Sequence, residues 1–363
     1  MKKVIAMVLA FAMTACLLAG CGKTDNEAPP AAPAQSGDSA QDTAPEDNTN
    51  AGDAAASYEW PQVGSVENVK IVEQEPEKPL KFAFLGYSNN SYWDLIYQGV
   101  NGATEFLAGH NVTIDQINLG TDIGADVMNN ALESCMLQGY DGIICTTFVT
   151  GCENYINQCV DAGIPVGIIG GEGGESKRAF CIAGDSFATS NIAAEYIDKA
   201  LGGEAGATFG VIVAQFSMEV TEKARNNAIS ILEDKGYVCV GSYEAHDSAD
   251  EVYTITEQLM TAYPDLGAVY CVSGGTYGMP AAVVDAGKGG EVYCFGNDEI
   301  AENIEYVRQG VMDVVGQNPA GYAFDAFMYL YNIVVAGQYP ENDTMAAAAP
   351  VITKDNVDEL FPQ

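Results

Sequence analysis

The chain has 363 residues, and its 50 acidic side chains against 15 lysines and arginines give it a formal net charge of −35. This charge excludes a nucleic-acid partner, because binding to phosphates requires a basic surface. It also excludes electrostatic attraction to anionic lipid. The hydrophobic content of 48% is normal for a globular protein.

The first residues have the organisation of an export signal. A basic start is followed by an apolar run from Val4 to Leu18 and by small residues before Cys21. The run is too short to span a bilayer comfortably. Leu18-Ala19-Gly20-Cys21 resembles the end of a bacterial lipoprotein signal, which implies removal of residues 1–20 and a diacylglycerol thioether on Cys21. The alternative is an ordinary signal peptide with an incidental cysteine.

Residues 22–57 are rich in Ala, Pro, Asp, Ser, Gly, Asn and Thr, with almost no large apolar side chain. Such a composition cannot bury enough surface to fold. We therefore predict a lipidated Cys21 and a flexible linker over residues 21–78. This anchor would hold the protein outside the cytoplasm, where ATP, NAD and nucleic acid are poor candidates for its ligand.

From about residue 79, continuous apolar runs alternate with amphipathic segments. The first half predicts strands over 81–87, 112–118, 142–146 and 164–169, separated by helices over 93–107, 122–137 and 151–162. The second half predicts strands over 207–213, 237–243, 268–272 and 292–295, with helices near 188–201, 220–235, 249–262, 276–286 and 299–309. Strands of this kind indicate parallel sheets covered on both faces. Two such sets predict an α/β fold with two doubly wound parallel-sheet lobes, joined by a hinge around a ligand cleft.

Eight cysteines remain once Cys16 and Cys21 are set aside. Most of them lie in apolar strand-like runs, as small core residues do. Cys152 and Cys159 are separated by about 10 Å of helix rise, too far for a disulfide. No CxxC pair is present, so a zinc site is not expected. We therefore expect mostly free, buried thiols.

Ligands of open parallel sheets bind beyond the carboxyl ends of strands, so the residues after each strand matter most. Ser88–Trp93 follows the first strand. Its Ser and Asn residues suit a helix N-cap, and its aromatic residues suit a core. The same residues could instead bind a sugar, because the C–H faces of a sugar pack on aromatic rings and its hydroxyls form hydrogen bonds with amides.

The chain resembles the sugar-binding type of periplasmic binding protein, the family of ribose- and galactose-binding proteins. The similarity runs from about residue 79 to 360 and rests on the order of short segments. These are Ser88–Trp93 (with Ser91 in place of a proline), Tyr140–Ile144, Ala162–Val166, Gly184-Asp185 and Val351–Asn356. The resemblance implies the type I fold of that family. Its N-terminal lobe would be 79–184 plus about 318–345, and its C-terminal lobe 185–317 plus about 346–363.

The resemblance also implies ligand contacts from both lobes. In the first lobe it assigns an amide to Asn90 and stacking rings to Tyr92 and Trp93. In the second lobe it assigns to Arg225 a hydrogen bond with sugar hydroxyls, and to Asp298 the acceptance of two hydroxyls. The alternatives are a solvated helix charge for Arg225 and a helix N-cap for Asp298.

Four further positions complete the predicted site. Gln317 matches the family's hinge glutamine, with a plain hinge turn as the alternative. Gly170-Gly171 replaces the family's Asp-Arg pair, so Glu172 is a candidate substitute. His246-Asp247 stands where an aromatic residue often closes the second lobe, and Ser273 stands where an asparagine is common. These departures leave the identity of the ligand open.

No catalytic motif is present in the sequence. It has two histidines, no GxSxG or HExxH motif and no calcium-binding loop, and its glycine-rich stretches lack a phosphate-binding signature. Asp298 and Glu172 are the only carboxylate pair that could serve a carbohydrate-cleaving enzyme. We therefore expect no enzymatic activity, no cofactor and no metal.

The predicted function is that of a lipid-anchored receptor subunit of an ABC importer. It would be a monomer that closes on a small sugar-like solute and docks on ABC permease subunits. One alternative is a sensor that serves a chemoreceptor or a histidine kinase, and another is an extracellular carbohydrate-acting enzyme. A sugar-responsive transcription regulator shares the core fold, but the signal and the lack of a basic helix-turn-helix argue against it.

Overall fold

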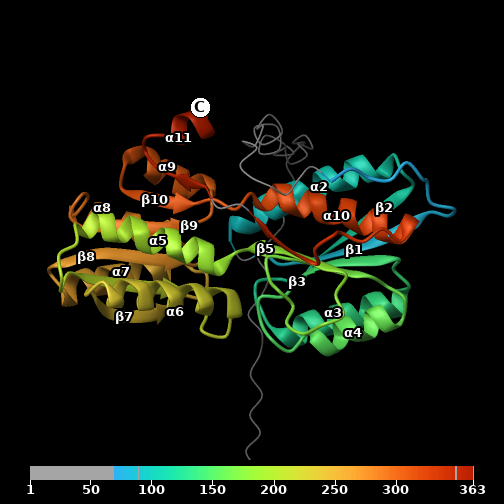
Figure 1. Ribbon diagram of the computed structural model, residues 1–363, viewed down its shortest axis with the longest axis horizontal. Coiled ribbons are helices and arrows are strands. Elements are labelled where there is room, and N and C mark those ends of the chain that lie inside the picture. Colours follow the sequence, from blue (N-terminus) through green and yellow to red (C-terminus); the bar gives the residue numbers. More distant parts are fainter. Residues whose placement is uncertain (1–68, 89, 348–349, 363) are drawn as a thin grey trace, which may run out of the picture. The chain divides into compact units, whose positions relative to one another are not determined.

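The computed structural model describes residues 69–88, 90–347 and 350–362. The predicted signal, Cys21 and the linker up to residue 68 lie outside the described residues. Two six-stranded sheets organise the chain (Figure 1). The first has the order β11 (Thr344–Ala347), β5 (Phe180–Gly184), β4 (Val166–Ile169), β3 (Gly142–Thr146), β1 (Leu80–Gly86), β2 (Val112–Asn118). The second has the order β12 (Val351–Ile352), β10 (Met312–Val315), β9 (Tyr293–Asn297), β8 (Leu266–Val272), β6 (Thr208–Val213), β7 (Val238–Glu244).

Helices cover both faces of the first sheet, and we call this assembly the first lobe. On one side lie α2 (Tyr92–Ala108) and α10 (Pro319–Ala336), and on the other lie α3 (Ala125–Gln138) and α4 (Glu153–Asp161) (Figure 1). The α2 and α10 helices pack closely, because a Cβ atom on Gly99 would overlap the carbonyl oxygen of Ala320. The buried runs of β1, β3 and β4 supply the centre of the core.

The second sheet and its helices form the second lobe, which has one apolar core on each face. The α5 (Ser186–Leu201) and α6 (Glu219–Asp234) helices share one core. The other core takes α7 (Ala249–Ala262), α8 (Gly278–Asp285), α9 (Ala301–Gln309) and α11 (Val357–Leu360). Strand β6 serves both, because Val211 and Val213 face the first core while Ile212 faces the second.

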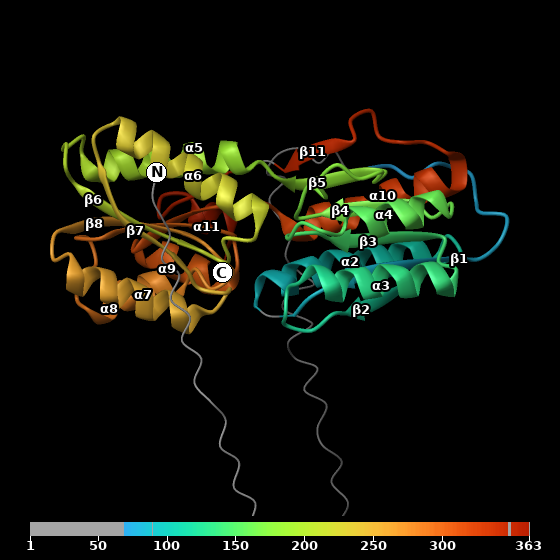
Figure 2. The same cartoon turned by 90° about the horizontal axis from the view of Figure 1, so that it is seen from below.

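The chain passes between the two sheets three times. It crosses after β5, after β10 and between β11 and β12. Figure 2 shows β11 beside β5, with which it pairs in parallel. In the second lobe β12 pairs antiparallel to β10, whereas the other described pairings are parallel. The predicted fold class of two doubly wound parallel-sheet lobes is confirmed.

The folded part begins earlier than the predicted linker allowed. The backbone N–H of Val72 donates to Asn332 Oδ1 (2.8 Å), and Asn332 Nδ2 donates to the carbonyl of Lys70 (2.9 Å). The Tyr331 hydroxyl donates to the carbonyl of Gln74 (3.0 Å). Residues 69–75 therefore lie along α10, and the prediction of a flexible linker up to residue 78 is wrong for this stretch.

The eight cysteines of the described chain are free thiols, as expected, and all except Cys239 are buried. Burial raises the thiol pKa of Cys135 to about 12 and those of Cys152 and Cys159 to about 11. These thiols stay protonated at neutral pH and serve as core side chains.

The first lobe contains a buried carboxyl group, that of Asp325, which should make the stability of the protein depend on pH. Asp325 on α10 is 4% exposed, and burial raises its pKa to about 7, although the Val69 N–H opposes this shift. An unfolded aspartate titrates near pH ~3.9. The folded state therefore binds this proton more tightly, and stability falls as pH rises from about 4 to 7. We expect Asp325→Asn to raise the unfolding free energy above pH 7 by up to about 4 kcal/mol.

The measurement is thermal unfolding of wild type and variant across this pH range. The difference in Tm should grow between about pH 4 and pH 7 and then level off. Asp265→Asn, at an exposed position, is the control and should show no such trend. A constant difference at every pH would contradict the prediction.

Candidate ligand-binding site

A cavity of about 110 Å³ lies where residues that follow the strands of both sheets come together. From the first lobe it is lined by residues after β1, β2, β3 and β4, and from the second by residues after β6, β7, β8 and β9. Gly184 and Gln317 line it where the chain crosses between the sheets. This arrangement follows from parallel strands, whose carboxyl ends lie along one edge of each sheet.

The first lobe contributes an amide and aromatic side chains. Asn90 Oδ1 accepts the backbone N–H of Tyr92 (3.0 Å), so its side chain holds the first turn of α2 and also lines the cavity. The Tyr92 hydroxyl is hydrogen-bonded to the hydroxyl of Tyr322 on α10. This contact ties the Tyr92 ring to the helix that begins at the crossing.

Trp93 belongs to the core more than to the cavity. It is 1% exposed, and its ring makes edge-to-face contacts with Tyr87, Tyr92 and Phe148 at centroid distances of 5.4, 5.8 and 5.8 Å. With these rings packed around it, Trp93 leaves little of its surface to the cavity that it helps to line. Phe148, which also lines the cavity, was missed by the sequence analysis. The sequence feature that could have identified it is its position, as an aromatic residue shortly after the predicted strand β3.

The second lobe contributes two aspartates in an unusual backbone conformation. Asp247 and Asp298 have φ values of 58° and 75°, a region that few residues other than glycine adopt. Asp247 Oδ1 accepts the hydroxyl of Ser273 (3.2 Å) and the N–H of Gly274 (2.6 Å). Gln317 Nε2 donates to Asp298 Oδ1 (3.2 Å). Strain of this kind is often found at functional sites.

The region around Asp298 is strongly acidic. Burial, followed by the charges of Glu299 and Asp247, raises the pKa of Asp298 well above its usual range. Burial also raises the pKa of Glu299, although it accepts the backbone N–H groups of Gln317 (2.8 Å) and Asn318 (2.5 Å). The backbone therefore satisfies Glu299, while Asp298 is at the cavity wall.

Asn297 is a second lining residue that the sequence analysis missed. It is 6% exposed, and its Oδ1 atom has no hydrogen-bond partner among the residues that the structure describes. Its backbone carbonyl and that of Asp298 both accept Asn303 Nδ2 (3.0 and 2.8 Å), which fixes the turn after β9. The sequence feature that could have identified Asn297 is its position at the end of a strand, directly before Asp298.

The structure brings together seven of the nine predicted ligand-binding residues. The seven that line the cavity are Asn90, Tyr92, Trp93, Asp247, Ser273, Asp298 and Gln317. Glu172 and Arg225 do not line it. Glu172 Oε2 instead pairs with Lys223 Nζ (2.8 Å).

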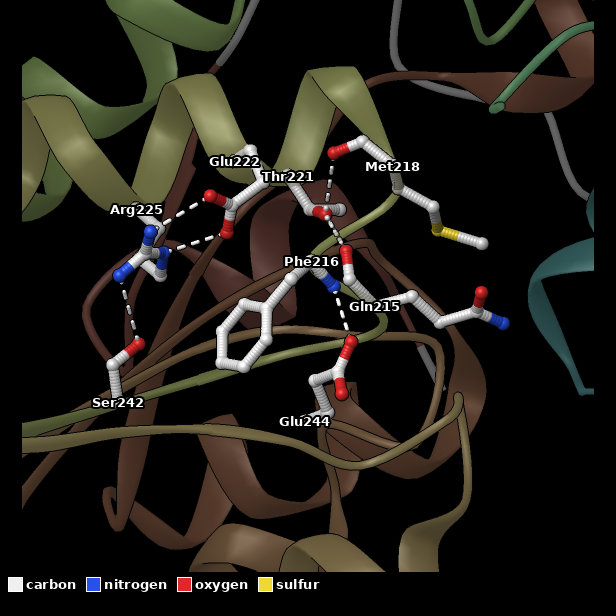
Figure 3. A network of polar contacts seen from close by, with 8 residues as sticks. All are labelled: Gln215, Phe216, Met218, Thr221, Glu222, Arg225, Ser242 and Glu244. Carbon is white, nitrogen blue, oxygen red and sulfur yellow. Dashed lines mark hydrogen bonds and ion pairs between the residues drawn. The ribbon is translucent and has the colours of Figure 1, made fainter. Parts of the chain in front are cut away.

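Arg225 is held on another side of α6. Its Nε and Nη2 atoms donate to the two oxygens of Glu222 (2.6 and 2.7 Å), and Nη1 donates to Ser242 Oγ (3.4 Å). Figure 3 shows the guanidinium group between these two side chains. It also lies over the ring of Phe216, 5.1 Å from the centroid. The helix instead presents Thr221 and Ala224 to the cavity.

Several contacts join the two lobes around the cavity. Besides Glu172 with Lys223, the Ser91 hydroxyl donates to Glu302 (2.7 Å), and an isolated β-bridge links Val149 with Met218. A Cβ atom on Gly274 would overlap the side-chain amide of Asn90. The absence of a side chain at position 274 therefore lets the two lobes approach.

The described residues contain no group of three or more His, Cys, Asp or Glu side chains placed to hold a metal ion. Within the same part of the chain, no helix combines the length and apolarity needed to cross a membrane.

Comparison with protein families gives a match to the model described as the periplasmic binding protein domain, over residues 82–338. The chain belongs to this family. The matched range includes most of both sheets, without β11 and β12, and all the described lining residues of the cavity. Membership of a periplasmic family implies a location outside the cytoplasm.

Several solved structures of sugar-binding proteins have a similar fold. GanP, a glucose-galactose binding protein from Geobacillus stearothermophilus, is 21% identical with a TM-score of 0.69, over 79% of this chain and all (100%) of GanP. A solute-binding protein from Burkholderia graminis C4D1M in complex with D-arabinose is 17% identical with a TM-score of 0.71, over 77% of this chain and 96% of that one. A third, from Actinobacillus succinogenes 130z with bound D-allose, is 18% identical with a TM-score of 0.68, over 77% and 99% of the two chains. No curated protein matches the chain.

The contact between Gly274 and Asn90 predicts the effect of a larger side chain. We expect Gly274→Val to push the amide of Asn90 away and to separate the lobes, because the added atoms have no free space. Small-angle X-ray scattering should then give a larger radius of gyration than for the unsubstituted protein.

Gly289→Val is the matched control, since a Cβ atom at position 289 meets no atom within 4 Å. It should leave the radius of gyration unchanged. An unchanged radius for a folded Gly274→Val protein would show that this contact does not limit the approach of the lobes.

Proposed function

We propose that this chain is the extracytoplasmic substrate-binding protein of an ABC importer and that it binds a sugar or a sugar-like small polar solute. The observation that carries the proposal is the cavity between aromatic side chains of the first lobe and oxygen acceptors of the second. Family membership supports it, as do the sugars named for the related solved structures.

The two sides of the cavity suit the two kinds of surface that a sugar presents. Tyr92 and Phe148 offer apolar ring surface to C–H groups. Asp247 and Asp298 offer carboxylate oxygens, which form strong hydrogen bonds with hydroxyls. A ligand that contacts both lobes stabilises the closed arrangement over an open one, and this difference drives closure.

The role proposed for each predicted residue follows from its position relative to the cavity. Asn90, Tyr92, Asp247, Ser273, Asp298 and Gln317 would contact the ligand directly, and Trp93 would support the rings of Tyr92 and Phe148 from behind. Glu172 would act through Lys223 as a link between the lobes. Arg225 would hold the start of α6 in place through Glu222.

The remaining parts of the proposal concern the setting of the protein. A lipid on Cys21 would anchor a monomer to the bacterial cell membrane, and the closed form would dock on permease subunits. The binding proteins among the related structures support a role without catalysis. The pairing of Glu172 with Lys223, away from the cavity lining, gives no support to a carbohydrate-cleaving pair with Asp298.

A screen with the full chain tests ligand binding. At least one monosaccharide should raise the Tm, because a ligand that binds only the folded state stabilises it. For that ligand, Tyr92→Ala and Asp298→Ala should each weaken affinity by about 10- to 100-fold, through loss of a ring surface and of a hydrogen-bonding carboxyl group. Isothermal titration calorimetry measures these affinities.

Tyr339→Ala, at an exposed tyrosine outside the cavity lining, is the control and should bind as the unsubstituted protein does. The proposal fails if no sugar raises the Tm. It also fails if both cavity variants, shown to be folded, keep full affinity.

A further inference from the structure

Polar side chains gather in the part of the cavity where β1 of the first lobe faces β8 and β9 of the second. Ser273 and Asp298 follow β8 and β9, and Asp247 is hydrogen-bonded to Ser273. From the first lobe Asn90 reaches this group, because a Cβ atom on Gly274 would overlap its amide. We call the lining formed by Asn90, Asp247, Ser273 and Asp298 the polar end of the cavity.

The segment that follows β6 lines another part of the cavity, and it does so with mainly apolar side chains. Its lining residues are Ala214, Met218, Val220, Thr221 and Ala224. Thr221 is the polar member of this set, and its hydroxyl donates to the carbonyls of Gln215 and Met218 (3.1 Å each; Figure 3). The lining residues of this described segment therefore leave no side-chain hydrogen-bond donor for a ligand.

The polar side chains between positions 214 and 224 make their contacts elsewhere. Ser217 Oγ donates to Gln215 Oε1 (3.1 Å). Lys223 Nζ pairs with Glu172 and Glu219 (2.8 and 3.0 Å). None of these five residues is among the described lining residues. The segment contains polar and apolar residues, and the fold presents the apolar ones to the cavity.

The first lobe meets this segment with apolar side chains of its own. An isolated β-bridge joins Val149 to Met218, so the loop that carries Phe148 lies beside Met218. Ala214 and Met218 are buried in the same apolar cluster as the core of the first lobe, and Phe148 packs against that cluster. The apolar surfaces of the two lobes are therefore continuous here.

The residues after β4 add no polar side chain to this part of the lining. Gly170 lines the cavity, and a Cβ atom there would lie 2.9 Å from the Phe148 ring. A Cβ atom on Gly171 would overlap the carbonyl oxygen of Thr147. The ring of Phe148 thus takes the space that a side chain at position 170 would need. We call the lining formed by Phe148, Ala214, Met218, Val220 and Ala224 the apolar end of the cavity.

We propose that the ligand is a sugar with a small apolar substituent, such as the methyl group of a 6-deoxyhexose or of a methyl glycoside, and that this group binds at the apolar end. The inference rests on the proposed function and names the class of sugar. Burial of a methyl group against Phe148, Met218 and Val220 is favourable. A ligand hydroxyl placed there would lose its hydrogen bonds to water without replacement. Because the lobes touch at the bridge beside Met218, the group should be small.

The test compares matched pairs of sugars on the full chain by isothermal titration calorimetry. The 6-deoxy probes are D-fucose, L-fucose, L-rhamnose and 6-deoxy-D-glucose, each against its parent with a hydroxyl at carbon 6. The methyl glycosides of D-galactose, D-glucose and D-ribose are compared with the free sugars, which distinguishes the two positions of the methyl group. In at least one pair the methyl-bearing sugar should bind about tenfold or more tighter, as a methyl-sized group does in an apolar pocket.

Variants show whether the apolar end causes the preference. Val220→Thr keeps the branched shape of the side chain and adds a hydroxyl, so it should lower the affinity ratio of methyl-bearing sugar to parent sugar toward one. Met218→Gln keeps the length of the side chain, adds an amide and should act in the same direction. Val238→Thr, the same exchange at an exposed position outside the cavity lining, is the matched control and should leave the ratio unchanged.

Three outcomes would overturn the inference. If sugars bind but no methyl-bearing sugar binds more tightly than its parent, the inference is wrong while the proposed function stands. If a methyl preference is found and persists in the folded Val220→Thr and Met218→Gln proteins, the assignment to the apolar end is wrong. If no sugar raises the Tm, the proposed function and this inference fall together.

Discussion

Parallel pairing of strands is the constraint on which the rest of the structure depends. Because β1, β3 and β4 run in the same direction, the residues that follow them gather at one edge of the first sheet. The same holds for β6, β8 and β9 in the second sheet. Side chains far apart in sequence, such as Asn90 and Asp298, therefore line one cavity. The helices and the apolar cores serve to hold these two edges in place.

Charge gives the cavity its chemical character. Arg225 is one residue from the cavity-lining Ala224, yet its guanidinium group is held by Glu222 and Ser242 on another side of α6. Lys223 is held by Glu172 of the other lobe. Two nearby cations, Lys223 and Arg225, are thus used in structural contacts and do not line the cavity.

Much of this arrangement could be predicted from the sequence. Strands such as β1, β2 and β3 and amphipathic helices such as α7 were placed within a few residues, because the pattern of apolar residues shows which positions are buried. Strands β5, β10, β11 and β12 and helix α10 were not individually predicted. Helix α10 is buried along most of its length, so its apolar residues do not form the one-sided pattern that identifies an amphipathic helix.

Side-chain direction could not be predicted. Strand-end position correctly placed Asp247, Ser273 and Asp298 at the cavity, but it could not show that Trp93 is enclosed by three other rings. Nor could it show that Glu222 competes for Arg225, since a contact at the next helical turn depends on rotamers.

The attachment of residues 69–75 to α10 has a mechanical consequence. The hydrogen bonds of Asn332 and Tyr331 join this stretch to the first lobe alone. A force applied to the amino-terminal side of the chain would thus be borne by α10 and the sheet beneath it, and the three crossings would carry none of it. In a protein fixed at that end, the second lobe is the part that can move relative to the anchor.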